Sequence, residues 1–326
     1  MLVQVVPTGA RLILCDNLQL MYEYKASRTV TVAVGSSEQV VLALSGGEII
    51  YLEVDPAART LVVKASATLD QDIACLSLYA AVGGLSPESD AAMAVEEEEV
   101  QDPSQGQAKS IVLAVGMWTD NSVRLFAAQT LQELTRTQLG VETQAQARDV
   151  VLVSLGEAAA ATLYLMVGLG DGTLITFIVD FLDGLPKMTS RRKVVIGTHP
   201  ISLTSFSNAG LPCVFASCDR PTVLSTRNGK LIFSVVNISE VTGMSPFHSE
   251  MFPECLALSS EVGLMIGTVD EIQKLHVQTY SLGESPRRIA HCSQSGVYAG
   301  DSSYLVCHMS HDSVHALLTN NGLPSQ

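Results

Sequence analysis

The residues best suited to metal chemistry are seven cysteines and seven histidines. Four of them fall within nine residues, Cys307, His308, His311 and His315, and form the only cluster in the sequence that resembles a metal site. Thiol and imidazole groups can hold zinc, but this spacing matches no common zinc finger, and the surrounding segment lacks a clear strand or helix pattern. An odd number of cysteines without a CxxC pair favours buried thiols in a reducing compartment over a disulfide framework. We predict no metal site and no cofactor.

Patterns that would indicate an enzyme are missing. No GxSxG nucleophile elbow occurs, and no histidine pairs recognisably with a cysteine or serine and an acid. The segment Gly168–Gly172 has the spacing GxGxG, and a strand-like run follows it where a dinucleotide site needs a helix N-terminus. Asp171-Gly172 is instead a strong hairpin-turn pair. The sequence therefore predicts a protein that is not an enzyme.

A repeated unit organises the chain. Each copy has an apolar strand, a small residue, a turn with an acid and a second apolar strand. The copies cover 42–54, 113–126, 165–179, 214–227 and 264–277. The turn acids Asp120, Asp171, Asp219 and Asp270 are separated by 51, 48 and 51 residues. A period of about 50 residues is typical of β-propeller blades. We predict an all-β fold, a β-propeller with about five visible blades of a seven-bladed ring.

The gap between the first two copies is longer than the period. From Glu48 to Asp120 it measures 72 residues, and the segment 83–110 accounts for the excess. This segment holds Pro87, Pro103 and the acidic run Glu96–Glu99, and it has no aromatic residue. Its composition predicts an exposed, disordered acidic insertion.

Composition excludes several classes of protein. The 326 residues are 47% hydrophobic, which is enough for a folded core. The net charge of −14 disfavours direct binding of nucleic acid by this chain. No uncharged apolar run of 18 residues appears, and the first residues do not resemble a signal peptide. We expect a soluble intracellular protein without membrane contact.

Four segments resemble one known family. They are Gly116–Asp120, Ser217–Leu224, Gly267–His276 and Glu284–Ile289, with Gly170–Gly172 in support. Together they are similar to the adaptors of cullin 4 RING ubiquitin ligases, which are the large subunits of UV-damaged DNA-binding complexes. The residues that carry this likeness are Asp120, Asp171, Asp219, Arg220, Pro221, Asp270, Glu271, Gln273 and Lys274.

The resemblance implies a domain organisation. The family has three seven-bladed propellers and a helical C-terminal domain. By this likeness, residues 1–283 correspond to a partial middle propeller, and residues 284–326 to the start of the next propeller followed by an unassigned tail. In the family the middle propeller holds the cullin, while the other two bind substrate receptors.

The resemblance also implies an interaction site. An acid before the Ala-Cys-Leu strand and the tryptophan of the next blade face the cullin in this family. Here they are Asp72, where the family typically has glutamate, and Trp118, the only tryptophan. The implied partner is the N-terminal domain of cullin 4, the implied process is ubiquitination in DNA damage repair, and the implied location is the nucleus and cytoplasm. From the sequence alone, without the resemblance, we would predict that Trp118 is buried in the core of a blade and that Asp72 is a solvent-exposed charge at a strand edge.

Two alternatives stay open at this point. Related propeller scaffolds occur in mRNA polyadenylation and splicing factors, although the motifs around Asp219 and Asp270 favour the damage-binding branch. The chain could also be a truncated, non-functional fragment, since an incomplete ring exposes unpaired strand edges.

Overall fold

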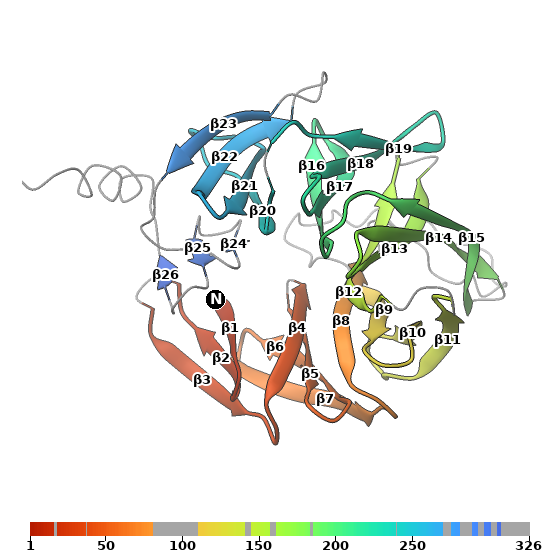
Figure 1. Cartoon of the computed structure of the whole chain (residues 1–326). Coiled ribbons are helices and arrows are strands. Elements are labelled where there is room, and N and C mark those ends of the chain that lie inside the picture. Colours follow the sequence, from red (N-terminus) through yellow and green to blue (C-terminus); the bar gives the residue numbers. More distant parts are fainter. Residues whose placement is uncertain are drawn as a thin grey trace, which may run out of the picture.

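The computed structural model consists of antiparallel β-sheets throughout its described part, which covers residues 1–15, 18–36, 38–80, 110–140, 145–156, 161–182, 185–238, 240–269, 275–280, 289–292, 297–300 and 305–307. Seven sheets follow one another in chain order, and we number them sheets 1 to 7. Figure 1 shows them arranged around a common centre. In the same described ranges, no helix has the length and apolar composition needed to cross a bilayer.

The strands have the following bounds. Sheet 1 contains β1 (Leu2–Val6), β2 (Gly9–Ile13) and β3 (Leu20–Lys25). Sheet 2 contains β4 (Val30–Ser36), β5 (Gln39–Leu44), β6 (Glu48–Asp55) and β7 (Thr60–Thr68). Sheet 3 contains β8 (Ile73–Ala80), β9 (Ser110–Met117), β10 (Ser122–Ala127) and β11 (Glu133–Gln138). Sheet 4 contains β12 (Ala147–Leu155), β13 (Thr162–Leu169), β14 (Thr173–Leu182) and β15 (Leu185–Val195).

The second half of the chain continues the pattern. Sheet 5 contains β16 (Ser202–Asn208), β17 (Leu211–Ser217), β18 (Thr222–Arg227) and β19 (Lys230–Val235). Sheet 6 contains β20 (Gly243–Phe247), β21 (Cys255–Ser260), β22 (Gly263–Val269) and β23 (Leu275–Tyr280). Sheet 7 contains β24 (Ile289–Cys292), β25 (Val297–Gly300) and β26 (Leu305–Cys307).

The hydrophobic core lies between neighbouring sheets. Every residue of β5, Gln39–Leu44, is buried, because both faces of the strand are covered. Between sheets 3 and 4, Leu125 packs in one cluster with Leu165 and Phe177. Corresponding clusters join sheets 1 and 2, 2 and 3, 4 and 5, and 5 and 6. Sheets 1 to 6 therefore bury their apolar faces against one another, as expected of propeller blades.

The sheets share one orientation. The first strands of sheets 2 to 7 line the centre, where β4 contacts β8, β8 contacts β12, and the series continues to β24 (Figure 1). In sheets 2 to 5, the turn between the second and third strands lies beside the linker to the next sheet. The same backbone hydrogen bond recurs there, from Leu69 to Gly47, Leu139 to Asn121, Ile196 to Gly172 and Val236 to Pro221, at 2.8–2.9 Å. These turns and linkers form one face of the ring, which we call the turn face.

The prediction of an all-β propeller is confirmed. Four of the five sequence repeats coincide with the second and third strands of sheets 2 to 5. The repeat at 264–277 instead covers β22 and β23, the third and fourth strands of sheet 6, so its acid is not equivalent to Asp219. The equivalent turn of sheet 6 holds Glu261 and Val262. Asp270 lies 51 residues after Asp219, which fits the repeat period. Because consecutive strands of a blade are all apolar, this spacing did not reveal that the repeat is shifted by one strand.

The predicted count of about five blades is confirmed only in part: the described strands form five sheets of four strands, and the prediction omitted sheets 1 and 7, which have three described strands each. The domain boundary at residue 283 stays a prediction; β24, which follows it, lies beside β20. The insertion 83–110 falls outside the described residues except for Ser110, the first residue of β9.

Candidate protein-interaction site

Trp118 and Asp72 lie next to each other on the turn face. Trp118 follows β9, and Asp72 precedes β8 in the linker from sheet 2. The backbone N–H of Trp118 donates a hydrogen bond of 3.0 Å to the carbonyl oxygen of Asp72. The Trp118 side chain is 36% exposed, so it is a surface residue of the turn and not part of the blade core. An exposed tryptophan of this kind is a typical anchor of protein interfaces.

The side chain of Asp72 holds the linker to the preceding sheet. Its Oδ1 accepts a hydrogen bond of 2.7 Å from the backbone N–H of Gly46, in the turn between β5 and β6. One residue earlier, Gln71 Oε1 accepts a hydrogen bond from the Thr119 hydroxyl. The linker is therefore tied both to the turn of sheet 2 and to the turn that carries Trp118.

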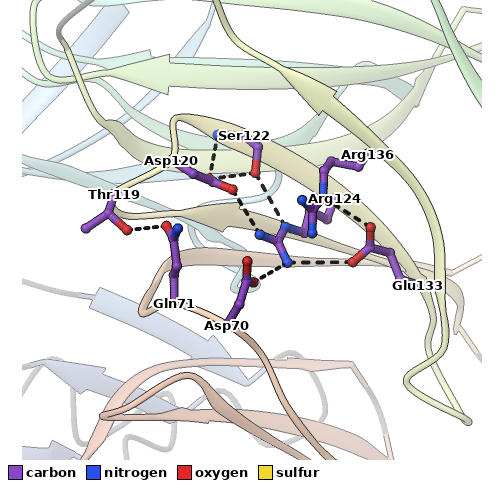
Figure 2. A network of polar contacts seen from close by, with 8 residues as sticks. All are labelled: Asp70, Gln71, Thr119, Asp120, Ser122, Arg124, Glu133 and Arg136. Carbon is purple, nitrogen blue, oxygen red and sulfur yellow. Dashed lines mark hydrogen bonds and ion pairs between the residues drawn. The ribbon is translucent and has the colours of Figure 1, made fainter.

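A buried arginine, Arg124, holds the turn between β9 and β10 that carries Trp118. Figure 2 shows Arg124 of β10 surrounded by carboxylates. Its Nη1 lies 2.6 Å from Asp70 Oδ1 and 3.6 Å from Glu133 Oε2, and its Nη2 lies 2.9 Å from Asp120 Oδ2. The Arg124 side chain is only 2% exposed. One guanidinium thus joins the linker, the turn and β11, which makes the support of Trp118 rigid.

The charges in this network stabilise one another. The hydrogen bond from Arg124 lowers the pKa of Asp70. Burial would raise the pKa of Asp120, but hydrogen bonds from Ser122 and Arg124 outweigh it and lower that pKa. Burial likewise opposes the charge of Arg124, yet its bonds to Asp70 and Asp120 raise its pKa. All three groups are therefore ionised at neutral pH.

The ring of Trp118 is also in contact with a cation. The Arg148 guanidinium carbon lies 5.4 Å from the centroid of the ring, within cation–π range. Arg148 is exposed and comes from the start of β12, in the next sheet. The turn of sheet 3 and the first strand of sheet 4 therefore form one surface around Trp118.

The other family-motif residues in the described part build turns. Asp171 Oδ1 accepts a hydrogen bond from the Thr173 N–H at 3.0 Å. Asp219 accepts hydrogen bonds from the N–H groups of Thr198 and His199 at 2.9 and 3.1 Å, which fixes the linker between sheets 4 and 5. The carbonyl oxygens of Arg220 and Pro221 accept bonds from Thr222 and Val236. Asp270, Glu271, Gln273 and Lys274 lie outside the described residues.

The insertion attaches far from Trp118. In the pairing of β8 with β9, Ile73 faces Met117 at one end, and Ala80 faces Ser110 at the other. The insertion connects Ala80 to Ser110, whereas Asp72 and Trp118 follow the opposite end. At about 3.3 Å per residue, the two ends of this strand pair are roughly 23 Å apart. The two attachment points of the insertion, Ala80 and Ser110, therefore lie away from Asp72 and Trp118.

Sequence reasoning missed Asp70, Gln71, Arg124 and Arg148. Arg124 could have been found, because a lone charge within the apolar run Ser122–Ala127 needs buried partners. Asp70 and Gln71 of the linker and Arg148 do not interrupt an apolar run, so the sequence offered no comparable indication for them. As for metal binding, no group of three or more potential ligands occurs among the described residues. His308, His311 and His315 lie outside them, and so does the side chain of Cys307.

Comparison with known proteins now identifies the family. Residues 1–269 match the family model described as the RSE1/DDB1/CPSF1 second beta-propeller. The chain is 39% identical over 299 residues to DNA damage-binding protein 1a of Arabidopsis thaliana, which covers 91% of this chain and 24% of the relative. It is 38% identical to DNA damage-binding protein 1 of Solanum lycopersicum and 32% identical to that of Drosophila melanogaster, each over 91% of this chain. The chain spans about a quarter of the length of these relatives. It belongs to the RSE1/DDB1/CPSF1 family and corresponds to the second propeller of that family.

Proposed function

We propose that this chain is a non-enzymatic scaffold whose turn face binds the N-terminal domain of cullin 4 in a RING ubiquitin ligase. The ring we propose has seven blades, and the process it serves is ubiquitination linked to DNA damage repair in the nucleus and cytoplasm. Substrate receptors would bind to other parts of the longer proteins of this family, and this chain would not bind nucleic acid itself.

The observation that carries the proposal is the exposed Trp118 held against Asp72. These are the two residues that the family resemblance assigned to the cullin-facing surface, and they meet through a backbone hydrogen bond of 3.0 Å. A 36%-exposed tryptophan on a rigid turn offers apolar area at little entropic cost to a binding partner. The relatives support the damage-binding branch, because those compared above carry the name DNA damage-binding protein 1. The family model also includes RSE1 and CPSF1, so a scaffold of an RNA-processing complex is the second candidate.

Binding of the purified chain to the cullin 4 N-terminal domain tests the proposal. We expect Trp118→Ala to weaken binding by about 2 kcal/mol or more, as for an interface hot spot. Phe181→Ala is the matched control, because Phe181 is 40% exposed but lies near the far end of β14 from the turn face. It should bind as the wild type does.

Circular dichroism of each variant separates folding from binding. A folded wild-type chain that does not bind would show that the cullin assignment is wrong. A wild-type chain that does not fold would favour the fragment alternative. Equal losses in both variants would mean that Trp118 is not the anchor.

A further inference from the structure

The two arginines near Trp118 differ in how their charge is compensated. Arg124 is buried and has carboxylate oxygens of Asp70, Asp120 and Glu133 within 4 Å. Arg148 is exposed, and no carboxylate of the described residues forms an ion pair with it. Within the described part of the chain, the charge of Arg148 is therefore not paired with a carboxylate, whereas that of Arg124 is.

The nearby acids on the turn face are engaged elsewhere. Asp149, the next residue, accepts hydrogen bonds from the Ser202 hydroxyl and the Leu203 N–H at 2.9 and 2.8 Å. Asp171 accepts from Thr173 within its own turn. Neither Asp149 nor Asp171 forms an ion pair with Arg148 in the described part of the chain.

Arg148 is held in place by its surroundings. The N–H of Gly170 donates a 3.0 Å hydrogen bond to the carbonyl of Gln146, which fixes the chain two residues before Arg148. A methyl group built on Gly170 would lie 3.7 Å from Arg148 Cγ, so the aliphatic stem packs on this glycine. The guanidinium reaches from there to the Trp118 ring at 5.4 Å. The cation and the ring are thus presented together by two adjacent sheets.

We propose that Trp118 and Arg148 form one composite recognition element, which selects a partner segment that carries an apolar side chain next to a carboxylate. The apolar side chain would pack on the exposed part of the indole, and the carboxylate would pair with the guanidinium of Arg148. This inference rests on the proposed function and specifies the chemistry of the cullin segment that binds there. The chain carries a net charge of −14, so most of its surface repels an acidic partner segment. The guanidinium of Arg148 would attract the carboxylate of such a segment at this one place.

Binding of the cullin 4 N-terminal domain to the full chain at two salt concentrations tests this inference. Arg148→Gln removes the cation, and Arg192→Gln is the matched control, since Arg192 is an exposed arginine on the outer strand β15. Both variants change the net charge equally. We expect Arg148→Gln to weaken binding about tenfold at low salt and to flatten its salt dependence, as loss of a specific ion pair should. Arg192→Gln should stay within about twofold of the wild type.

Two further variants locate the effect. Arg148→Lys keeps the charge but not the flat guanidinium, so it should keep the salt dependence and lose only part of the affinity. Lysine substitutions at acidic residues of the cullin domain should include one that restores binding to Arg148→Glu. If Arg148→Gln behaves like Arg192→Gln while Trp118→Ala abolishes binding, the composite element is wrong and the proposed function stands. If the folded wild-type chain does not bind, both are wrong.

Discussion

The backbone N–H of Trp118 donates to the carbonyl oxygen of Asp72 at 3.0 Å, which joins the turn of sheet 3 to the linker from sheet 2. Two strands and the long insertion separate these residues in sequence. Their contact depends on the pairing of β8 with β9, which places Ile73 opposite Met117. The insertion 83–110 is attached at the other end of the same strand pair, where Ala80 lies opposite Ser110.

Asp72 should act mainly by positioning the linker. Its Oδ1 accepts a 2.7 Å hydrogen bond from Gly46, and asparagine keeps such an acceptor. We expect Asp72→Ala to lower the free energy of unfolding by about 1 kcal/mol and to weaken cullin binding, while Asp72→Asn changes both far less. Urea denaturation and binding measurements check this. Equal loss of binding in the two variants would show instead that the negative charge contacts the partner.

Arg124 should contribute more to the free energy of unfolding than the exposed Arg136 does. Replacement by methionine leaves Asp70, Asp120 and Glu133 without their shared cation, and we expect a loss of about 1–3 kcal/mol in the free energy of unfolding. Arg124→Lys should recover part of it, since one ammonium cannot reach all three carboxylates. Arg136→Met is the control, because Arg136 is 43% exposed and pairs only at the edge of the network in Figure 2. Chemical denaturation should show less than about 0.5 kcal/mol for it.

The pair of His199 and Glu240 should respond to pH. His199 Nδ1 lies 2.9 Å from Glu240 Oε1, and this hydrogen bond raises the pKa of His199. Because the folded state binds the proton more tightly, the pair contributes stability below the ordinary histidine pKa of about 6.5 and loses it as the pH rises through the folded value. An NMR titration of His199 measures this directly. Glu240→Gln should bring the pKa back down, and Glu38→Gln, at an exposed residue between β4 and β5 of sheet 2, should not.

Gly172 should be hard to replace. It has a φ of +78°, and a methyl group there would overlap the backbone of Gly197 in the linker to sheet 5. Gly210 has a similar φ of +76° but nothing within 4 Å of the added methyl. We therefore expect Gly172→Ala to lower the melting temperature clearly more than Gly210→Ala, which carries only the conformational cost of about 1 kcal/mol. Similar melting temperatures for the two variants would mean that the linker around Gly197 moves aside at little energetic cost.

The core cysteines should be unreactive in the native chain. Cys15, Cys75, Cys213, Cys218 and Cys255 are buried as free thiols. Burial raises the pKa of Cys75 well above that of a free thiol, and it raises those of Cys213, Cys218 and Cys255 as well. Alkylation followed by peptide mapping should modify these residues only after unfolding. Rapid labelling of Cys75 without denaturant would contradict the packing of sheets 3 and 4 around it.

The strands were predictable because their residues are short apolar runs separated by turn residues. Segments such as Ile49–Val54 and Leu174–Val179 appear in the structure within β6 and β14. The place of a strand within its blade was not predictable for the repeat at 264–277, since buried strands on either side of a turn look alike in sequence. Trp118 and Asp72 were connected in advance only by resemblance to a family, and nothing in their local sequence indicated exposure or proximity.

The sequence by itself determined the fold class, the turn acids Asp120, Asp171 and Asp219, the acidic balance and the family, because periodicity, turn chemistry and motifs are local properties. Tertiary structure alone decided that Trp118 is exposed, that Asp72 is hydrogen-bonded to it, that Arg148 lies over its ring, and that Arg124 is surrounded by carboxylates. These relations join residues from the linker, from sheet 3 and from sheet 4, and they arise only when the blades pack side by side. Whether a charged side chain is paired with an opposite charge can be decided only when its neighbours in space are known.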